Sequence, residues 1–135
     1  MNQKEYSDYV LDKILKEFPQ FIDYYDYKND IVIIEFPSPA GLLKLWITTQ
    51  DTELTIGVEG KEPKWDWHTH MSLFSAYEPD DEIREASQLI KSIFSGNEYI
   101  VSNSELGYSI TDNPDDAFEN RKDNEKVEIK KWNEL

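Results

Sequence analysis

Three β-rich runs in quick succession constrain the fold of this chain more than any other feature. Residues 31–36 are almost entirely apolar, and residues 43–47 and 54–58 alternate aliphatic side chains with other types. Alternation with a period of two places the aliphatic side chains on one face of a strand. The connections between the runs are short and rich in Pro, Gly and polar residues, which favours antiparallel neighbours. Residues 31–58 therefore predict a three-stranded meander.

Two amphipathic segments flank these strands and predict helices that pack on a sheet. In residues 4–18 apolar side chains recur at helical spacing, and Pro19 ends the pattern because it disfavours helical backbone before it. Asn2 and Glu5 resemble a capping box at the start. The acidic run Glu78-Pro79-Asp80-Asp81 opens the second helix, and Gly96 is a natural C-terminal stop. Its apolar stripe consists of Ile83, Ala86, Leu89, Ile90, Ile93 and Phe94.

The last part of the chain predicts further short strands. The strand candidates are residues 99–102, 108–110 and 126–132. Residues 111–124 are acidic and polar, and we expect a flexible loop there, with a short helix near Ala117 and Phe118. Together these segments predict an α+β fold: an antiparallel sheet of five to six strands with two helices, in a single domain over residues 1–135.

A Trp/His stretch lies between the meander and the second helix. Residues 65–71 hold two of the four Trp and both His of the chain. If this stretch is extended, Asp66, His68 and His70 share one face. Two His at this spacing could chelate an ion, but a metal site needs at least one more ligand, and the chain has no third His and no Cys. We expect structural imidazoles and no metal or cofactor; the alternative is a small metal-dependent or ligand-binding enzyme that uses His68 and His70.

Several residue types and motifs that are missing from the sequence limit the catalytic chemistry and the cellular compartment that we expect for the chain. Without Cys, disulfides and thiolate metal sites are excluded, and the composition suits a reducing cytosol. The polar N-terminus does not resemble a signal peptide, and no apolar run approaches the roughly 20 residues that cross a bilayer, so we expect a cytoplasmic protein. Neither a Gly-x-Ser-x-Gly elbow nor a Gly-rich phosphate loop occurs, and nothing singles out a pair of catalytic carboxylates.

The charge balance predicts what kind of partner the chain accepts. The 28 acidic and 14 basic residues give a net charge of −14. Such a field repels nucleic acid and anionic membranes. It attracts a cation, a basic protein, or a protein surface that normally binds nucleic acid. The simpler interpretation is that the acids are solvated faces and helix caps, present for solubility.

Two acidic stretches are the candidates for partner binding. The first comprises Asp23, Tyr24, Tyr25, Asp26 and Tyr27, and the second comprises Asp80, Asp81 and Glu82. The first combines carboxylates with rigid aromatic side chains, which interfaces favour. Its alternative role is a connector whose rings cover the edge of the sheet. The second stretch opens the predicted helix, where favourable interaction with the helix dipole explains part of its charge.

The order of these features resembles a known class of proteins. The chain is short and acidic, with a Trp-x-Trp-His-Thr-His segment, a helix ending in Ser95-Gly96, later strands and a terminal Trp132. In this it resembles the small immunity proteins encoded beside bacterial polymorphic toxins. The resemblance implies a protein that binds a cognate toxin and blocks it without enzymatic activity. The toxin would be a nuclease or another enzyme with a basic site; a structural adaptor without an inhibitory role is a further alternative.

Overall fold

The chain folds into helices and antiparallel strands, so the α+β class is confirmed. A computed structural model describes residues 1–60 and 66–135, and Trp65, the first residue of the Trp/His stretch, lies outside the described residues. The described strands form two sheets, in the orders β1-β2-β3-β4-β5 and β7-β6-β8, rather than the one sheet of five to six strands that the sequence predicted. No helix of the described residues is long and apolar enough to cross a membrane.

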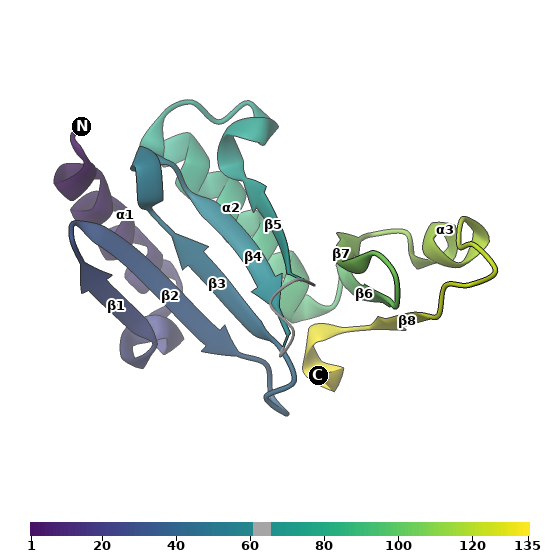
Figure 1. Cartoon of the computed structure of the whole chain (residues 1–135). Helices are drawn as coiled ribbons and strands as arrows, with labels where there is room; N and C mark the ends of the chain where they lie inside the picture. The colour runs from purple at the N-terminus through teal and green to yellow at the C-terminus, as the bar shows by residue number, and fades with distance from the viewer. Residues whose placement is uncertain (61–65) are drawn as a thin grey trace. The chain divides into compact units, whose positions relative to one another are not determined.

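The chain divides into two compact units, each described by itself. Unit 1 comprises Met1–Phe36, Leu45–Gly57 and His68–Leu89, and unit 2 comprises Pro37–Lys44, Val58–Trp67 and Ile90–Leu135. Within unit 1, Figure 1 shows helix α1 and the first part of helix α2 on one face of the five-stranded sheet. The other face of that sheet carries no helix of unit 1.

Helix α1 (Gln3–Glu17) forms because its start is capped and one side is apolar. The Asn2 side chain accepts from the Glu5 backbone N–H, and the Glu5 carboxylate accepts from the Asn2 N–H at 3.2 Å, so the predicted capping box is confirmed. Three apolar side chains of one stripe are buried: Tyr6, Val10 and Ile14. The helix ends at Phe18, whose φ of −128° leaves the helical region before Pro19.

Strands β1 (Tyr25–Lys28) and β2 (Ile31–Pro37) form a hairpin, with Tyr27 opposite Val32. The sequence predicted only a connector at β1, and the reason is its composition, which lacks aliphatic alternation. The two turn residues, Asn29 and Asp30, both adopt positive φ, at 53° and 64°. This is the conformation that a two-residue hairpin with the native strand twist requires, and Asn and Asp tolerate it better than most residues.

Strands β3 (Lys44–Thr48), β4 (Thr55–Glu59) and β5 (Trp67–His70) complete the five-stranded sheet. The predicted meander is confirmed, because β2, β3 and β4 are successive neighbours in the sheet. Alternate side chains of β3, Leu45 and Ile47, are fully buried, whereas those between them are partly exposed.

Helix α2 (Pro79–Ser95) has the predicted apolar stripe. Ala86, Ile90 and Ile93 are completely buried. Gly96 follows with a φ of +81°, the left-handed conformation that ends a helix. The second helix is therefore confirmed at both ends to within a residue.

The remaining elements belong to unit 2. Strand β6 pairs with β7 on one side and with β8 on the other, both antiparallel. The short helix α3 lies inside the stretch 111–124, where the sequence predicted a loop with a short helix. The bounds are β6 (Tyr99–Asn103), β7 (Gly107–Thr111), α3 (Pro114–Glu119) and β8 (Val127–Lys130).

Candidate functional site

The first candidate stretch lies at an edge of the five-stranded sheet. Asp23 ends a 3₁₀ turn, η1 (Pro19–Asp23), and Tyr25 begins β1, which pairs with β2 alone among the strands of the described residues. Tyr24 and Tyr25 are 42% and 38% exposed, and the Tyr24 ring packs edge-on against Phe36 at 5.1 Å. Asp26 forms a solvent-exposed ion pair with Lys28. This edge therefore presents two exposed carboxylates and two exposed aromatic rings, and the Tyr24 ring is held by its contact with Phe36.

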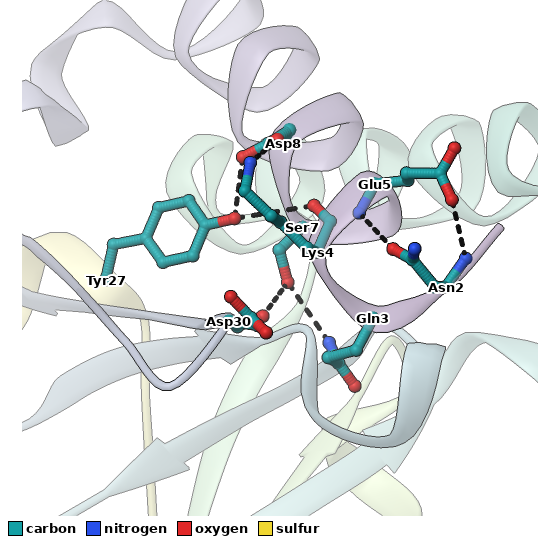
Figure 2. Close-up of polar contacts among 8 residues, drawn as sticks. All are labelled: Asn2, Gln3, Lys4, Glu5, Ser7, Asp8, Tyr27 and Asp30. Atoms are coloured by element: carbon teal, nitrogen blue, oxygen red, sulfur yellow. Dashed lines mark hydrogen bonds and ion pairs between the residues drawn. The ribbon is translucent and has the colours of Figure 1, made fainter.

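Tyr27 differs from its neighbours because it turns toward α1. Its hydroxyl donates to Asp8 at 2.6 Å. Lys4, one turn earlier in the helix, forms an ion pair with the same carboxylate at 2.7 Å (Figure 2). The hydrogen bond to Asp8 raises the pKa of Tyr27 to about 12. The bonds from Lys4 and Tyr27 lower the pKa of Asp8. Tyr27 thus positions β1 on the helix, and its hydroxyl is already engaged.

A buried polar network fixes the neighbouring turns to α1. The Ser7 hydroxyl donates to the Asp30 carbonyl at 2.6 Å and lies 2.7 Å from the Thr49 hydroxyl, which in turn accepts from the Val32 N–H. Gln3 donates to Ser7 at 3.1 Å (Figure 2). Ser7 and Thr49 are almost completely buried, so these bonds satisfy groups that water does not reach. The network holds the β1–β2 turn and the start of the β3–β4 connection in place.

The second candidate stretch divides into two surface acids and one buried acid. Asp80 accepts a hydrogen bond from the Tyr9 hydroxyl, and Asp81 pairs with Arg84 at 2.9 Å. Glu82, however, is only 6% exposed. The prediction that Glu82 contacts a partner is therefore wrong, since its carboxylate faces the interior.

Glu82 instead links helix α2 to helix α1 and to the residue just before strand β4. Its Oε2 atom accepts from the backbone N–H of Leu54 at 2.9 Å and from the hydroxyl of Tyr6. Burial, followed by the hydrogen bond and the charge of Glu82, raises the pKa of Tyr6, which keeps the hydroxyl a donor. Helical spacing offered a signal, because Glu82 precedes the buried Ala86 and Ile90 by one and two steps of four residues.

Adjacent residues of α1 contact both candidate stretches. Asp8 accepts from Tyr27 of β1, and Tyr9 donates to Asp80 of α2. One turn of α1 therefore lies between the two acidic stretches, and the structure brings them to two sides of the same helix. Helix α1 thus contacts one residue of each acidic stretch, Tyr27 and Asp80.

The two histidines lie close together on β5. The ring centroids of His68 and His70 are 5.4 Å apart, and the Trp46 ring lies 5.9 Å from His68. Nδ1 of His70 is 2.8 Å from the Thr55 hydroxyl and 3.7 Å from a Glu53 oxygen. Over residues 1–60 and 66–135, no three His, Cys, Asp or Glu side chains are arranged to hold a metal ion. His70 is thus hydrogen-bonded to the side chain of Thr55.

A hollow of about 360 Å³ lies in unit 2, between the β6–β7 hairpin and α3. Polar side chains on its wall already bind one another: Glu125 accepts from the Asn103 amide at 3.1 Å, and the Arg121 guanidinium donates to the Phe118 carbonyl at 2.8 Å. Bonds from the Lys122 backbone and Asn103 lower the pKa of Glu125. These bonds stabilise the loop that follows α3.

One exposed apolar segment has no distinct signal in the sequence. Leu73, Phe74 and Tyr77, between β5 and α2, are 73%, 50% and 78% exposed. Apolar residues occur throughout residues 71–77, and the pattern alone does not distinguish the exposed ones from Met71 and Ala76, which are buried. Only the tertiary structure separates the two sets.

Comparisons of the chain with models of known protein families, with curated proteins and with solved structures find no match.

Proposed function

We propose that this chain is a non-enzymatic immunity protein that binds a cognate protein toxin and blocks it. The observation that carries the proposal is the exposure of Tyr24 and Tyr25 between the carboxylates of Asp23 and Asp26, in a chain with a net charge of −14. Rigid aromatic side chains supply contact area at low entropic cost, and carboxylates beside them recognise basic groups. A nuclease, or another enzyme whose active site is basic, is the toxin that suits this surface.

The mechanism is blockade assisted by electrostatic steering. A strongly negative protein approaches a basic cleft faster than a neutral protein does, and the carboxylates then occupy positions that substrate phosphates would take. The ion pair between Asp26 and Lys28 is no obstacle, because both side chains are largely exposed and such pairs contribute little. An Arg or Lys of the toxin can replace Lys28 with little cost.

The edge position of β1 adds to the proposed surface. Among the strands of residues 1–60 and 66–135 it lies at the end of the sheet order, next to β2, and an edge strand can offer backbone groups to a partner. Bonds from Tyr27 to Asp8, and from Ser7 to the turn at Asp30, hold this edge against α1. A strand that is already fixed loses little conformational entropy when it binds.

Co-expression tests the proposal. The protein encoded directly beside this chain is expressed alone and together with the chain, and growth and complex formation are measured. We expect toxicity that the wild-type chain suppresses. A chain carrying Asp23→Asn and Asp26→Asn should protect less well, whereas Glu119→Gln with Asp123→Asn, which removes the same charge from exposed positions in unit 2, should protect normally. Toxicity that persists with the wild-type chain, without a complex, would reject the proposal.

Metal analysis addresses the alternative enzyme. Protein purified without a His tag is assayed for zinc, nickel and manganese. We expect none in stoichiometric amount. A stoichiometric metal that disappears when both His68 and His70 are changed to Ala would favour a metal-dependent activity over the immunity proposal.

A further inference from the structure

The segment between β5 and α2 exposes large apolar side chains from a fixed backbone. We name Leu73, Phe74 and Tyr77 the apolar loop; their exposed fractions are 73%, 50% and 78%. Isolated exposed apolar residues are ordinary, but three large ones within five positions form a patch, and such patches mark interaction sites.

Buried anchors hold this segment at both ends. Met71 is fully buried and donates its backbone N–H to the Leu54 carbonyl at 2.9 Å. The Ser72 hydroxyl donates to Glu53 at 2.5 Å. Ala76, at the other end, is 1% exposed, and Ser75 between them adopts a φ of 61°. The fold thus buries Met71 and Ala76 and turns Leu73, Phe74 and Tyr77 outward.

The same anchors connect the apolar loop to a buried polar site of unit 1, the carboxylate of Glu82. Leu54 accepts from Met71 through its carbonyl and donates its N–H to Glu82. Glu82 also accepts from Tyr6 of α1. The loop is therefore fixed to the sheet and to both helices of unit 1, which prepares it to bind without a large ordering cost.

The surroundings of the apolar loop are acidic. Residues 71–83 contain four acids and no Lys, Arg or His. Of these acids Glu78 and Asp80 are exposed and Asp81 is partly exposed, whereas Glu82 is buried. Arg84 is the first base that follows, and it pairs with Asp81. We name Glu78, Asp80 and Asp81 the acidic rim; together with the apolar loop they complement an apolar pocket beside basic groups.

We infer that the apolar loop is the hydrophobic anchor for a partner protein that has an apolar pocket in a basic surface. This inference rests on the proposed function and adds the part of the chain that enters the toxin. A second copy of the chain is disfavoured because a two-fold contact would place one acidic rim against the other. An anionic membrane is disfavoured by the same charge.

The size of the patch defines its role. Aromatic side chains bury about 150–250 Å² each, whereas a stable interface covers about 800 Å² per partner. Three side chains therefore form the centre of an interface, and the acidic rim must supply much of the rest. Truncation of a central anchor lowers affinity by at least about thirtyfold.

Binding of the purified partner toxin by surface plasmon resonance tests the inference. Tyr77→Ala and Leu73→Ala should each weaken affinity about thirtyfold or more, mainly through faster dissociation. Leu106→Ala is the matched control, because Leu106 is 77% exposed in unit 2, and it should change affinity less than about twofold. Circular dichroism and urea unfolding should be unchanged in all three variants, since the truncated side chains are exposed.

The possible outcomes separate the two proposals. If the wild-type chain binds and the Tyr77 and Leu73 variants bind equally well, the inference about the loop fails while the immunity function stands. If the wild-type chain forms no complex, both fail. Sedimentation of the chain alone provides a further test: self-association that Tyr77→Ala abolishes would show that the loop binds a second copy. Binding to anionic phospholipid vesicles, lost in the same variant, would likewise overturn the inference.

Discussion

Removal of the Glu82 carboxylate should destabilise the protein more than any other single loss of charge among the candidate acids. Its Oε2 atom accepts from the backbone N–H of Leu54 and from the hydroxyl of Tyr6, and these residues are 0% and 2% exposed. In Glu82→Ala both donors lose their partner in a region that water does not reach. Each buried, unsatisfied donor costs about 1–3 kcal/mol, so the expected loss is about 2–6 kcal/mol.

A graded series separates the charge from the hydrogen bonds. Glu82→Gln keeps one oxygen in place to accept both bonds but removes the charge, so we expect a loss of about 1–2 kcal/mol. Tyr6→Phe removes one donor and leaves the bond from Leu54, with a loss of about 1.5–3 kcal/mol. Because Tyr6→Phe also removes the hydroxyl that Glu82→Ala leaves unsatisfied, the double variant should be less destabilised than the sum by about 1 kcal/mol or more.

Equilibrium urea unfolding, followed by tryptophan fluorescence, measures the series. Glu78→Gln is the control, because this exposed acid lies four residues before Glu82 and should change the free energy of unfolding by less than about 0.5 kcal/mol. If Glu82→Ala is no more destabilising than this control, or if the two losses add without coupling to Tyr6, Glu82 does not join the elements as described.

Further predictions concern the core and the polar contacts of β1. Ile90→Ala should lower the free energy of unfolding by about 2–5 kcal/mol, because Ile90 is fully buried; a change of a few tenths would contradict its place in the core. Gly57→Ala should cost about 1–3 kcal/mol, because the added Cβ would lie 2.3 Å from the Trp46 ring; an unchanged midpoint in urea would refute that contact. The pKa of Tyr27, about 12 against an ordinary 10.0, should fall toward 10 in Asp8→Asn when the ring is titrated by NMR. Since the folded pKa of Tyr27 is raised, the contribution of the Tyr27–Asp8 hydrogen bond to stability is present below about pH 10 and is lost as pH rises through about 12. The same Tyr27 pKa in the wild-type and Asp8→Asn proteins would exclude Asp8 as the cause.

The elements that the sequence predicted well are those with strong local signals. The capping box at Asn2 and Glu5 determines the start of α1, and the left-handed Gly96 determines the end of α2. The meander follows from alternation and short connections. Strand β1 was missed because Asp26 and Lys28 disfavour a strand and offset the preference of the two tyrosines for one, so pairing with β2 determines its conformation. The adjacent Asn29 and Asp30 were the available signal, since Asn and Asp favour turns with the positive φ that both residues adopt.

The candidate site was predictable only in part, because charge in a sequence does not show which carboxylates are turned inward. Asp80 and Glu82 look equivalent in an acidic run, yet one lies on the surface and the other is buried. The apolar loop was missed for the opposite reason: Leu73 and Tyr77 resemble core residues by type, and only the burial of Met71 beside them shows which side of the segment faces the interior. Both distinctions arise from contacts between segments far apart in the chain.

Association kinetics with the purified toxin, measured at low and high salt, test the central claim most directly. The Debye length falls from about 10 Å at 0.1 M salt to about 3 Å at 1 M, so long-range attraction between the acidic chain and a basic site is largely screened over that range. With a net charge of −14 on the chain, we predict that the association rate falls at least about tenfold while the dissociation rate changes less. An association rate that does not depend on salt would contradict the electrostatic mechanism, and the absence of any complex would contradict the immunity function itself.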